Sequence, residues 1–151
     1  MIDMKTADKN KLERFKRILK EHGLRLTHQR VVILSELVSD DGHPSAEEVY
    51  ARVVKKLPTI SLDTVYRTIA SFEEYDIVKR VQVLDDKGRF DSNLEVHHHL
   101  VCRRCKKIED FYWPDFDGLN IPGGLKNWGR VESKYVELRG LCRECRQKLK
   151  K

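Results

Sequence analysis

The 151-residue sequence contains no stretch that approaches the roughly 18 to 20 consecutive apolar residues of a membrane-spanning helix. The first residues, MIDMKTADKNK, also lack the apolar segment that a secretory signal requires. Neither an internal repeat nor a low-complexity segment is present. Apolar residues nevertheless make up 40% of the composition, which argues against disorder. We therefore expect a folded, cytoplasmic protein with no membrane attachment.

Cysteine is scarce as well, and its arrangement is informative. The four cysteines form two Cys-x-x-Cys pairs separated by 36 residues, Cys102 with Cys105 and Cys142 with Cys145. In a reducing compartment such pairs more often hold metal than form disulfides, and four thiolates make a closed tetrahedral zinc site that stabilises a small domain. Two disulfides, four unlinked thiols or a thiol-based redox switch are the alternatives. The sequence thus predicts a structural Zn(II) site.

Positive charge is concentrated at the N-terminal end. The chain has a net charge of +6, and residues 1–30 hold nine Lys and Arg side chains against four Asp and Glu, a local excess of +5. A basic surface favours an anionic partner, with nucleic acid foremost. Charge alone fits a solvated helix surface equally well, so a DNA-binding element must be sought in the rest of the pattern.

The first half of the sequence predicts four short helices followed by a β-hairpin. Thr27, Ser45 and Ser61 are placed as helix N-caps, and SAEE at the second of these forms a capping box. Pro58 is expected to end the third helix. The segment VKRVQVLDDKGRFD suggests two strands around a turn at residues 85–88. The predicted apolar stripes of the helices are Leu12, Phe15 and Leu19; Val31, Leu34 and Val38; Val49, Val53 and Leu57; and Leu62, Val65, Ile69 and Phe72.

Helices followed by a two-stranded wing are typical of a winged helix-turn-helix, whose last helix enters the DNA major groove. At about 100° per residue, Arg67 lies almost opposite the centre of the apolar stripe of the fourth helix, on an outer face that it shares with Asp63, Thr64 and Ser71. Arg67 would contact a guanine edge, and Tyr66 at the flank a thymine methyl. An ordinary amphipathic helix with a solvated face is the alternative. The DNA contacts that we predict come from Thr64, Tyr66, Arg67, Arg25 and Arg30.

From about residue 92 the sequence turns polar and rich in histidine. Three strand-like segments follow, HHHLVC, KKIEDFYW and SKYVELRGLC. The intervening stretch WPDFDGLNIPGGLKNWGR carries four glycines and two prolines, so any helix in it should be short. The predicted fold class is therefore α+β, with an N-terminal winged helix-turn-helix domain followed by a small α/β domain.

Three histidines precede the first cysteine pair. Side chains at i and i+2 of a strand face the same side, so His97 and His99 should project together while His98 points away. Two imidazoles are half of a metal site, because Fe(II) and Mn(II) take carboxylates beside imidazoles. An Asp or a His near a turn is more often a cap or a solvated side chain, which weakens any single choice for the other half. The candidates are Asp91, Asp110 and His43.

The sequence resembles the ferric uptake regulator (Fur) family of bacterial metal-dependent repressors in six motifs, which are LRLTHQR, HPSAEEVY, SLDTVYRTIASFEEYDIV, RFD, HHHLVCRRC and GLCREC. The resemblance covers roughly residues 8–148. It implies a homodimer that binds double-stranded operator DNA, with a winged-helix domain at residues 1–90. A metal-binding dimerisation domain that holds the four-cysteine zinc would occupy residues 91–151. A regulatory Fe(II) or Mn(II) would lock the two domains into a DNA-binding arrangement.

Carried over residue by residue, the resemblance assigns the regulatory metal to five ligands. His43 would come from the N-terminal domain and Asp91 from the hinge, and the C-terminal domain would add His97, His99 and Asp110. The nine residues HHHLVCRRC would then serve two metals, the cysteines the structural zinc and the histidines the regulatory ion.

Within the family, the peroxide-sensing members are the most similar, because Asp110 stands where iron sensors commonly have Glu. A further site of many iron sensors looks lost, since Lys134 and Val96 replace its histidines. We expect a repressor that binds operator DNA with Fe(II) or Mn(II) and that peroxide inactivates through iron-catalysed oxidation of histidine ligands. His28 and Asp63 replace a proline and a small residue of the family pattern, so the preferred DNA sequence should differ.

Three other functions compete with this hypothesis. An iron or zinc uptake regulator of the same family would use the metal as corepressor only. A zinc hydrolase or deaminase is disfavoured, because H-x-E with P-C-x-x-C does not occur and a zinc held by four cysteines has no open position. A zinc ribbon that binds only protein would lack metal-dependent affinity for DNA. We expect no enzyme activity, and no small molecule other than peroxide as signal.

Overall fold

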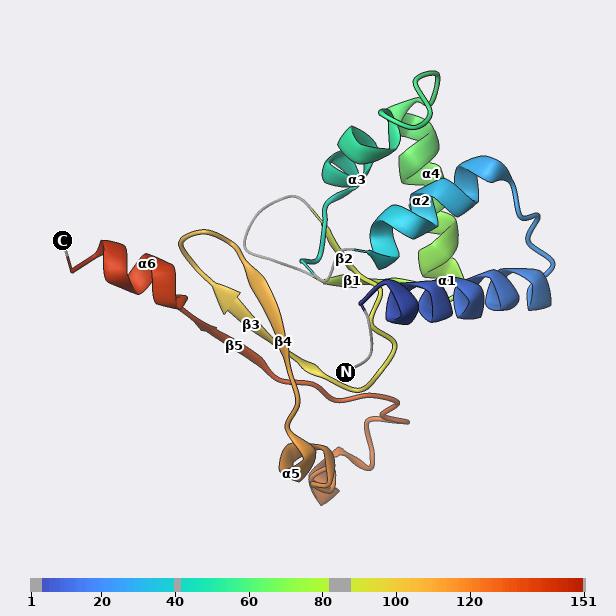
Figure 1. Ribbon diagram of the computed structural model, residues 1–151. Helices are drawn as coiled ribbons and strands as arrows, with labels where there is room; N and C mark the ends of the chain where they lie inside the picture. The colour runs from blue at the N-terminus through green and yellow to red at the C-terminus, as the bar shows by residue number, and fades with distance from the viewer. Residues whose placement is uncertain (1–3, 40–41, 82–87, 151) are drawn as a thin grey trace. The chain divides into compact units, whose positions relative to one another are not determined.

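The computed structural model describes residues 4–39, 42–81 and 88–150 and divides the chain into two compact units (Figure 1). The first unit comprises residues 1–94 and the second residues 95–151. None of the helices in the described ranges has the length and apolarity of a membrane span. Helices dominate the first unit and a sheet dominates the second, so the fold class is α+β as predicted.

Within its described residues, the first unit contains four helices and a two-stranded hairpin, in the order that the sequence predicts. In the hairpin, Lys79 pairs with Asp91, Arg80 with Phe90 and Val81 with Arg89 in antiparallel register. Of the predicted turn, residues 85–87 lie outside the described residues. The elements are α1 (Met4–Glu21), α2 (His28–Val38), α3 (Ala46–Val53), α4 (Leu62–Glu74), β1 (Lys79–Val81) and β2 (Arg89–Asp91).

All three predicted caps are present. The side chains of Thr27 and Ser61 accept hydrogen bonds from backbone N–H groups in the first turns of α2 and α4. Ser45 forms the complete capping box with Glu48, which satisfies two backbone donors at once. The prediction that α3 extends to Pro58 is wrong.

Helix α3 ends at Val53, and the chain then tightens into turns. The carbonyl of Val53 accepts from the N–H of Lys56 at an i to i+3 spacing and from that of Leu57 at i to i+4, so one last turn follows the helix. Proline restricts only the residue directly before it, so Pro58 marked the latest possible end of the helix rather than its actual end. Leu57 still packs against the core.

One apolar core joins the four helices and the hairpin. In α1 and α4 most of each predicted stripe is buried, with Phe15, Leu19 and Phe72 fully inside, whereas Leu12 and Leu62 are half-buried. In α2 the buried face includes Ile33 and Leu37, whereas the predicted Val31 is half-buried. The recognition-helix candidate α4 is thus fixed on one side by packing, and its opposite side is left to solvent.

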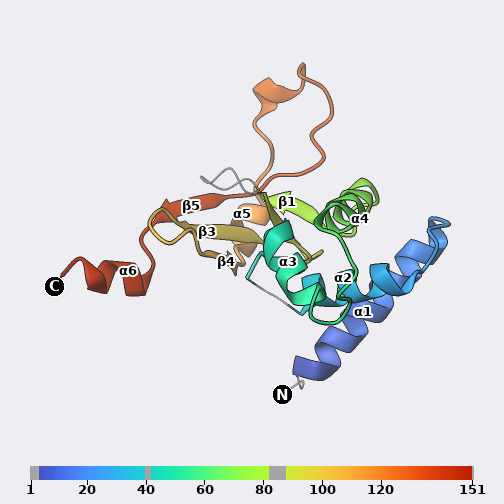
Figure 2. The ribbon, with the colours of Figure 1, turned by 90° about the horizontal axis from the view of Figure 1, so that it is seen from above.

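The second unit is a three-stranded sheet with short helices. The strand order is β4-β3-β5, with β3 antiparallel to β4 and parallel to β5. The stretch predicted to hold only a short helix contains α5 and a 3-10 turn, and the rest of it forms a loop between α5 and β5 (Figure 2). Helix α6, which begins directly after Cys142 and contains Cys145, was not predicted. The elements are β3 (His98–Cys102), β4 (Ile108–Phe111), α5 (Pro114–Asp117), η1 (Gly123–Leu125), β5 (Glu137–Gly140) and α6 (Arg143–Lys148).

The division between the units lies four residues beyond the predicted boundary at 90/91. The hydroxyl of Ser92 donates to the carbonyl of Leu37 at 3.2 Å, and Leu94 packs against the core of the first unit. Asp91, which we placed in a hinge, is therefore the last residue of β2 and a buried part of the first unit.

Candidate metal centres and DNA-binding face

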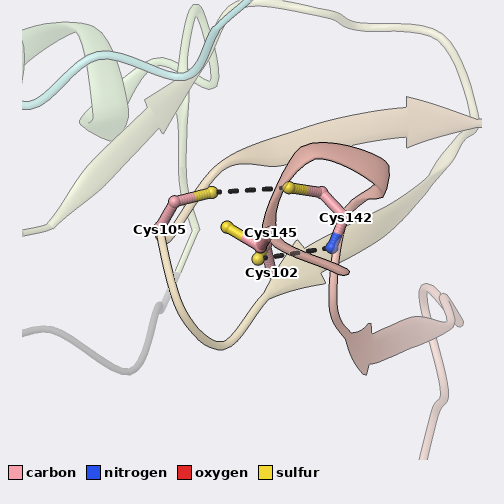
Figure 3. Close-up of side chains that lie close together, drawn as sticks. All are labelled: Cys102, Cys105, Cys142 and Cys145. Carbon is pink, nitrogen blue, oxygen red and sulfur yellow. Dashed lines mark hydrogen bonds between the residues drawn. The ribbon is translucent and has the colours of Figure 1, made fainter. Parts of the chain in front are cut away.

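The four cysteine sulfurs converge on one point in the second unit (Figure 3). Cys102 and Cys105 lie where β3 turns into β4, and Cys142 and Cys145 lie at the start of α6. The four Sγ atoms are within 4.8 Å of one another, and Cys105 and Cys142 are 3.7 Å apart. Sulfurs held about 2.3 Å from one tetrahedral zinc lie about 3.8 Å apart. No disulfide links the four, so the cluster has the donors and spacing of a zinc site.

Two of these thiols are oppositely perturbed. The backbone N–H groups of Cys105 and Cys142 donate to the sulfur of Cys102 and lower the pKa of that thiol to about 6. Burial is the main cause that raises the pKa of the Cys145 thiol to about 12. Cys102 is therefore an anion at neutral pH, whereas Cys145 must release a proton when it binds a metal.

A second group of donors in the same unit lies at the other end of β3. His97 and His99 bring their Nε2 atoms within 3.0 Å of each other, and each Nε2 is 3.6 Å from Oδ1 of Asp110 on β4. Register explains the approach, because His99 and Asp110 are direct partners across the β3–β4 ladder. Donors about 2.1 Å from a common ion lie about 3.0 to 3.6 Å apart for angles between 90° and 120°. These three residues therefore fit a metal ion.

The tautomer of His97 is set by the backbone. Its Nδ1 lies 2.7 Å from the carbonyl oxygen of Glu95, which can only accept a hydrogen bond. Nδ1 of the neutral ring must therefore carry the proton, so Nε2 acts as an acceptor and faces Nε2 of His99. Metal-binding histidines are commonly oriented by such a hydrogen bond on the other ring nitrogen.

His98 faces away from this group, as strand alternation predicts. It is fully buried against Phe111 and Phe116, with its Nδ1 accepting from the N–H of Val136 at 3.1 Å. The ring proton is then on Nε2, which lies 3.2 Å from Oδ1 of Asp117. His98 thus ties β3 to α5 and to the segment before β5.

His43 and Asp91 meet within the first unit. His43 Nε2 lies 3.8 Å from Asp91 Oδ1, and both side chains are buried. His43 has a φ of 55°, in the left-handed region that few non-glycine residues adopt. The neighbouring carbonyl of Pro44 accepts from the N–H of Phe90, which pins this segment beside β2. Such strained positions concentrate at functional sites.

The predicted DNA-contacting residues lie on two segments of the first unit. On α4, Tyr66 and Arg67 are exposed, while Thr64 is half-buried with its hydroxyl 2.8 Å from that of Ser61. Tyr66 donates its hydroxyl to Glu47 of α3 at 2.8 Å, and this hydrogen bond raises the pKa of Tyr66. Between α1 and α2, the Arg30 guanidinium donates to the carbonyl of Arg25 at 2.7 Å.

Sequence reasoning missed several residues that position the predicted ones. Glu47 was identified only as part of a capping stretch, and Asp117 only as part of a Gly- and Pro-rich loop. The carbonyl of Glu95 carries no side-chain signal at all. Lys134 was noted for the histidine it replaces, but its ammonium donates to the carbonyls of Phe116 and Leu119. The contacts of Glu47, Asp117 and Lys134 join residues far apart in the sequence, and that of Glu95 involves only its backbone, so no side-chain pattern signals them.

A winged-helix unit, a four-cysteine cluster and groups of imidazole and carboxylate donors together define a metal-dependent DNA-binding regulator. The sequence model of the Ferric uptake regulator family matches residues 21–120. The chain therefore belongs to the ferric uptake regulator family, and its cofactors are structural Zn(II) and a regulatory Fe(II) or Mn(II). The resemblance on which the sequence-based prediction rested is confirmed.

Individual relatives agree with this assignment. The chain is 35% identical to the peroxide-responsive repressor PerR of Staphylococcus epidermidis, over 85% of the chain and 86% of that protein. It is 36% identical to the peroxide operon regulator of Bacillus subtilis, over 86% of the chain and 90% of that protein. The structure of the Helicobacter pylori ferric uptake regulator, described as having three functional metal-binding sites, superposes with a TM-score of 0.75. The two are 25% identical over 92% of this chain and 93% of that one. These relatives are regulators, and the chain shares the class of metal-responsive transcriptional repressors.

Proposed function

We propose that the protein is a peroxide-responsive repressor that binds operator DNA as a homodimer when Fe(II) or Mn(II) is bound. The observation that carries this proposal is the convergence of His97 Nε2, His99 Nε2 and Asp110 Oδ1 within 3.0 to 3.6 Å. The two similar proteins named for peroxide response support it. In the resemblance, Asp at position 110 is a mark of the peroxide-sensing branch.

His43 and Asp91 complete the proposed ligand set. Each is buried in the first unit with its donor atom close to the other, as two ligands of one ion would be. Because His97, His99 and Asp110 belong to the second unit, an ion bound by all five would join the two units. It would stabilise the joined arrangement by its differential affinity for that arrangement, which is how metal binding would couple to DNA binding.

Peroxide would act on the histidines. Bound Fe(II) supplies one-electron reduction of peroxide, which Mn(II) does not readily support. The chain holds the imidazole carbons of His97 and His99 beside that reaction, so one of them takes up oxygen and becomes a 2-oxo-histidine. One peroxide oxygen enters the ring, the other leaves as water, and the ring carbon is oxidised by two electrons. A 2-oxo ring is a poorer ligand, so the two units would separate and DNA would be released.

The proposed partners are double-stranded operator DNA and a second copy of the chain. The basic and aromatic side chains on α4 and at residues 25–30 would contact DNA. The second unit exposes many large apolar side chains, more than an isolated domain of that size normally leaves in water. They include Leu100, Trp113, Leu119, Leu125, Trp128 and Leu138.

A DNA-binding assay with peptide mass spectrometry tests the proposal. The Fe(II) and Mn(II) forms are bound to a duplex from the promoter of the protein's own operon and treated with stoichiometric peroxide. The Fe(II) form should release the duplex and gain one oxygen atom on the peptide that contains His97 and His99. The Mn(II) form should do neither. Asp110→Glu should blunt the response of the Fe(II) form, because it moves the carboxylate relative to both imidazoles.

Two results would contradict the proposal. Retention of DNA and of unmodified histidines by the Fe(II) form would make the protein an iron or zinc uptake regulator of the same family. Equal release from both metal forms, with oxidised cysteines, would make the switch thiol-based and place it at the four-cysteine cluster.

A further inference from the structure

The outer face of α4 carries an acidic and a basic side chain that form an ion pair. Arg67 Nε lies 2.9 Å from Asp63 Oδ2, one helical turn away. The side chains are 82% and 70% exposed, so neither packs on the core. The guanidinium is therefore presented to solvent beside a carboxylate, on the face opposite the buried Val65, Ile69 and Phe72.

Stability does not account for this pair. An exposed i, i+4 ion pair contributes only about 0.3 to 0.5 kcal/mol, and a carboxylate in the first turn of a helix adds a similar small amount. A carboxylate on a DNA-facing surface also repels phosphates and so weakens binding to any sequence. A group that opposes general affinity is instead suited to discriminate between sequences.

Carboxylates also hold other side chains of the helix and the hairpin. In contrast, Arg30 is held by a neutral backbone carbonyl, that of Arg25. These contacts therefore leave the positive charge of residues 25–30 unneutralised, which favours binding to phosphates. The side chains on α4 are instead paired with carboxylates that orient them, which favours contacts with bases. The pairs that involve carboxylates are Tyr66 with Glu47, Arg80 with Glu73, and Arg89 with Glu48.

We propose that Asp63 and Arg67 together recognise one G·C base pair in the major groove, an inference that rests on the proposed binding to operator DNA. A G·C pair presents two acceptors, guanine N7 and O6, and next to them one donor, the amino group of cytosine N4. Arg67 donates through Nη1 and Nη2 to the guanine acceptors. Asp63 holds the guanidinium at Nε and accepts from the cytosine amino group.

The pair also rejects the alternative base pair. An A·T pair presents acceptor, donor, acceptor in the same places, because adenine has an amino group at N6 and thymine a carbonyl at O4. Arg67 would then face a donor, and the carboxylate of Asp63 would face an acceptor. Both contacts become repulsive, so the two residues act as one specificity-determining unit.

The test removes single functional groups from both partners. A duplex is first selected from a random pool with the wild-type Mn(II) form, and each G·C pair in the bound site is then modified. Replacement of guanine by 7-deazaguanine removes N7, and replacement of cytosine by 2-pyrimidinone removes the N4 amino group. At one G·C pair, each change should weaken wild-type binding about tenfold or more, as expected for hydrogen bonds to charged groups.

Variants then assign each contact to a residue. Arg67→Ala should become insensitive to 7-deazaguanine, and Asp63→Ala insensitive to 2-pyrimidinone at that same base pair. Asp63→Ala should also bind a random duplex more tightly than wild type, because a negative charge is gone. Glu21→Ala, which removes a charge from the exposed end of α1, is the matched control and should keep full sensitivity to both base changes. A merely structural role of Asp63 would alter thermal unfolding but not base sensitivity.

The outcomes separate this inference from the proposed function. A wild-type Mn(II) form that selects no duplex overturns the repressor proposal and the base-pair inference with it. A selected duplex without a G·C pair that depends on both groups overturns the inference alone. The same holds if Asp63→Ala remains as sensitive to 2-pyrimidinone as the wild type.

Discussion

At the scale of single residues, His98 depends on one partner at each ring nitrogen. Its Nδ1 accepts from Val136, which leaves the proton on Nε2 facing Asp117. The ring is fully buried, and its Nε2 lies 3.2 Å from Asp117 Oδ1 without the angle of a hydrogen bond, so the attraction between the two groups is electrostatic. Asp117 therefore stabilises the strand that carries the two metal-ligand candidates on either side of His98.

We predict that Asp117→Ala lowers the free energy of unfolding by about 0.5 to 1 kcal/mol, because the buried Nε2–H of His98 loses the carboxylate that attracts it. Asp117→Asn keeps an acceptor oxygen and should cost less. Chemical denaturation of the zinc-loaded protein, followed by tryptophan fluorescence, measures both. Equal losses in the two variants would show that the acceptor at Asp117 is not what matters.

The residue scale also shows where prediction from sequence succeeds. Strand alternation was enough to separate His97 and His99 from His98, because the side-chain period of a strand is fixed by the backbone. The proton position of His97 was not predictable, since it depends on the carbonyl of Glu95. Likewise the i, i+4 spacing of Asp63 and Arg67 was visible in the sequence. The hydrogen bond between Tyr66 and Glu47 was not predictable, because it joins two different helices.

At the scale of elements, the N-terminal caps of the helices were predicted correctly, whereas the C-terminal end of α3 was not. Ser45 caps α3 through a capping box, a pattern that lies entirely within the four residues from Ser45 to Glu48. The end of α3 at Val53 depends on how the following turns pack Leu57 against the core, which is tertiary information. Helix α6 escaped prediction because it is short and polar, and it is positioned by the cysteine cluster at its start.

The segment between α5 and β5 is held by one lysine. The Lys134 ammonium donates to the carbonyls of Phe116 and Leu119 and lies 5.3 Å from the centre of the Phe116 ring. These carbonyls are at the end of α5, where a positive charge is favoured and unpaired acceptors need donors. Lys134 thus ties the end of the loop to its beginning.

Lys134→Ala should therefore make residues 118–133 more susceptible to limited proteolysis, by several-fold in cleavage rate, with zinc content unchanged. Lys134→Arg keeps a cationic donor and should restore much of the protection, whereas Lys134→Gln should not. Cleavage sites mapped by mass spectrometry report the result. Unaltered protection in Lys134→Ala would mean that the loop is ordered by other contacts.

At the scale of the whole molecule, the two units depend on different forces. The first unit has a continuous apolar core of four helices and a hairpin. Few residues of the second unit are fully buried, among them Val101, Ile108 and two of the cysteines. A domain with so small a core commonly needs a metal to fold, and zinc joins the β3–β4 turn to α6 here.

Replacement of a zinc ligand should therefore affect the two units unequally. Cys102→Ser or Cys142→Ser leaves three thiolates, which hold zinc poorly, so each variant should lose about one zinc per chain and with it the fold of the second unit or the dimer.

Both tryptophans, Trp113 and Trp128, lie in the second unit, so their fluorescence reports on it alone. Far-ultraviolet circular dichroism reports mainly on the helices of the first unit. We expect the fluorescence to change because Trp113 loses its contact with the Phe116 ring, while most of the helical signal remains. A strong chelator should reproduce this in the wild type. A folded, zinc-free dimer of either variant would disprove the four-cysteine assignment, and simultaneous loss of both signals would disprove the independence of the first unit.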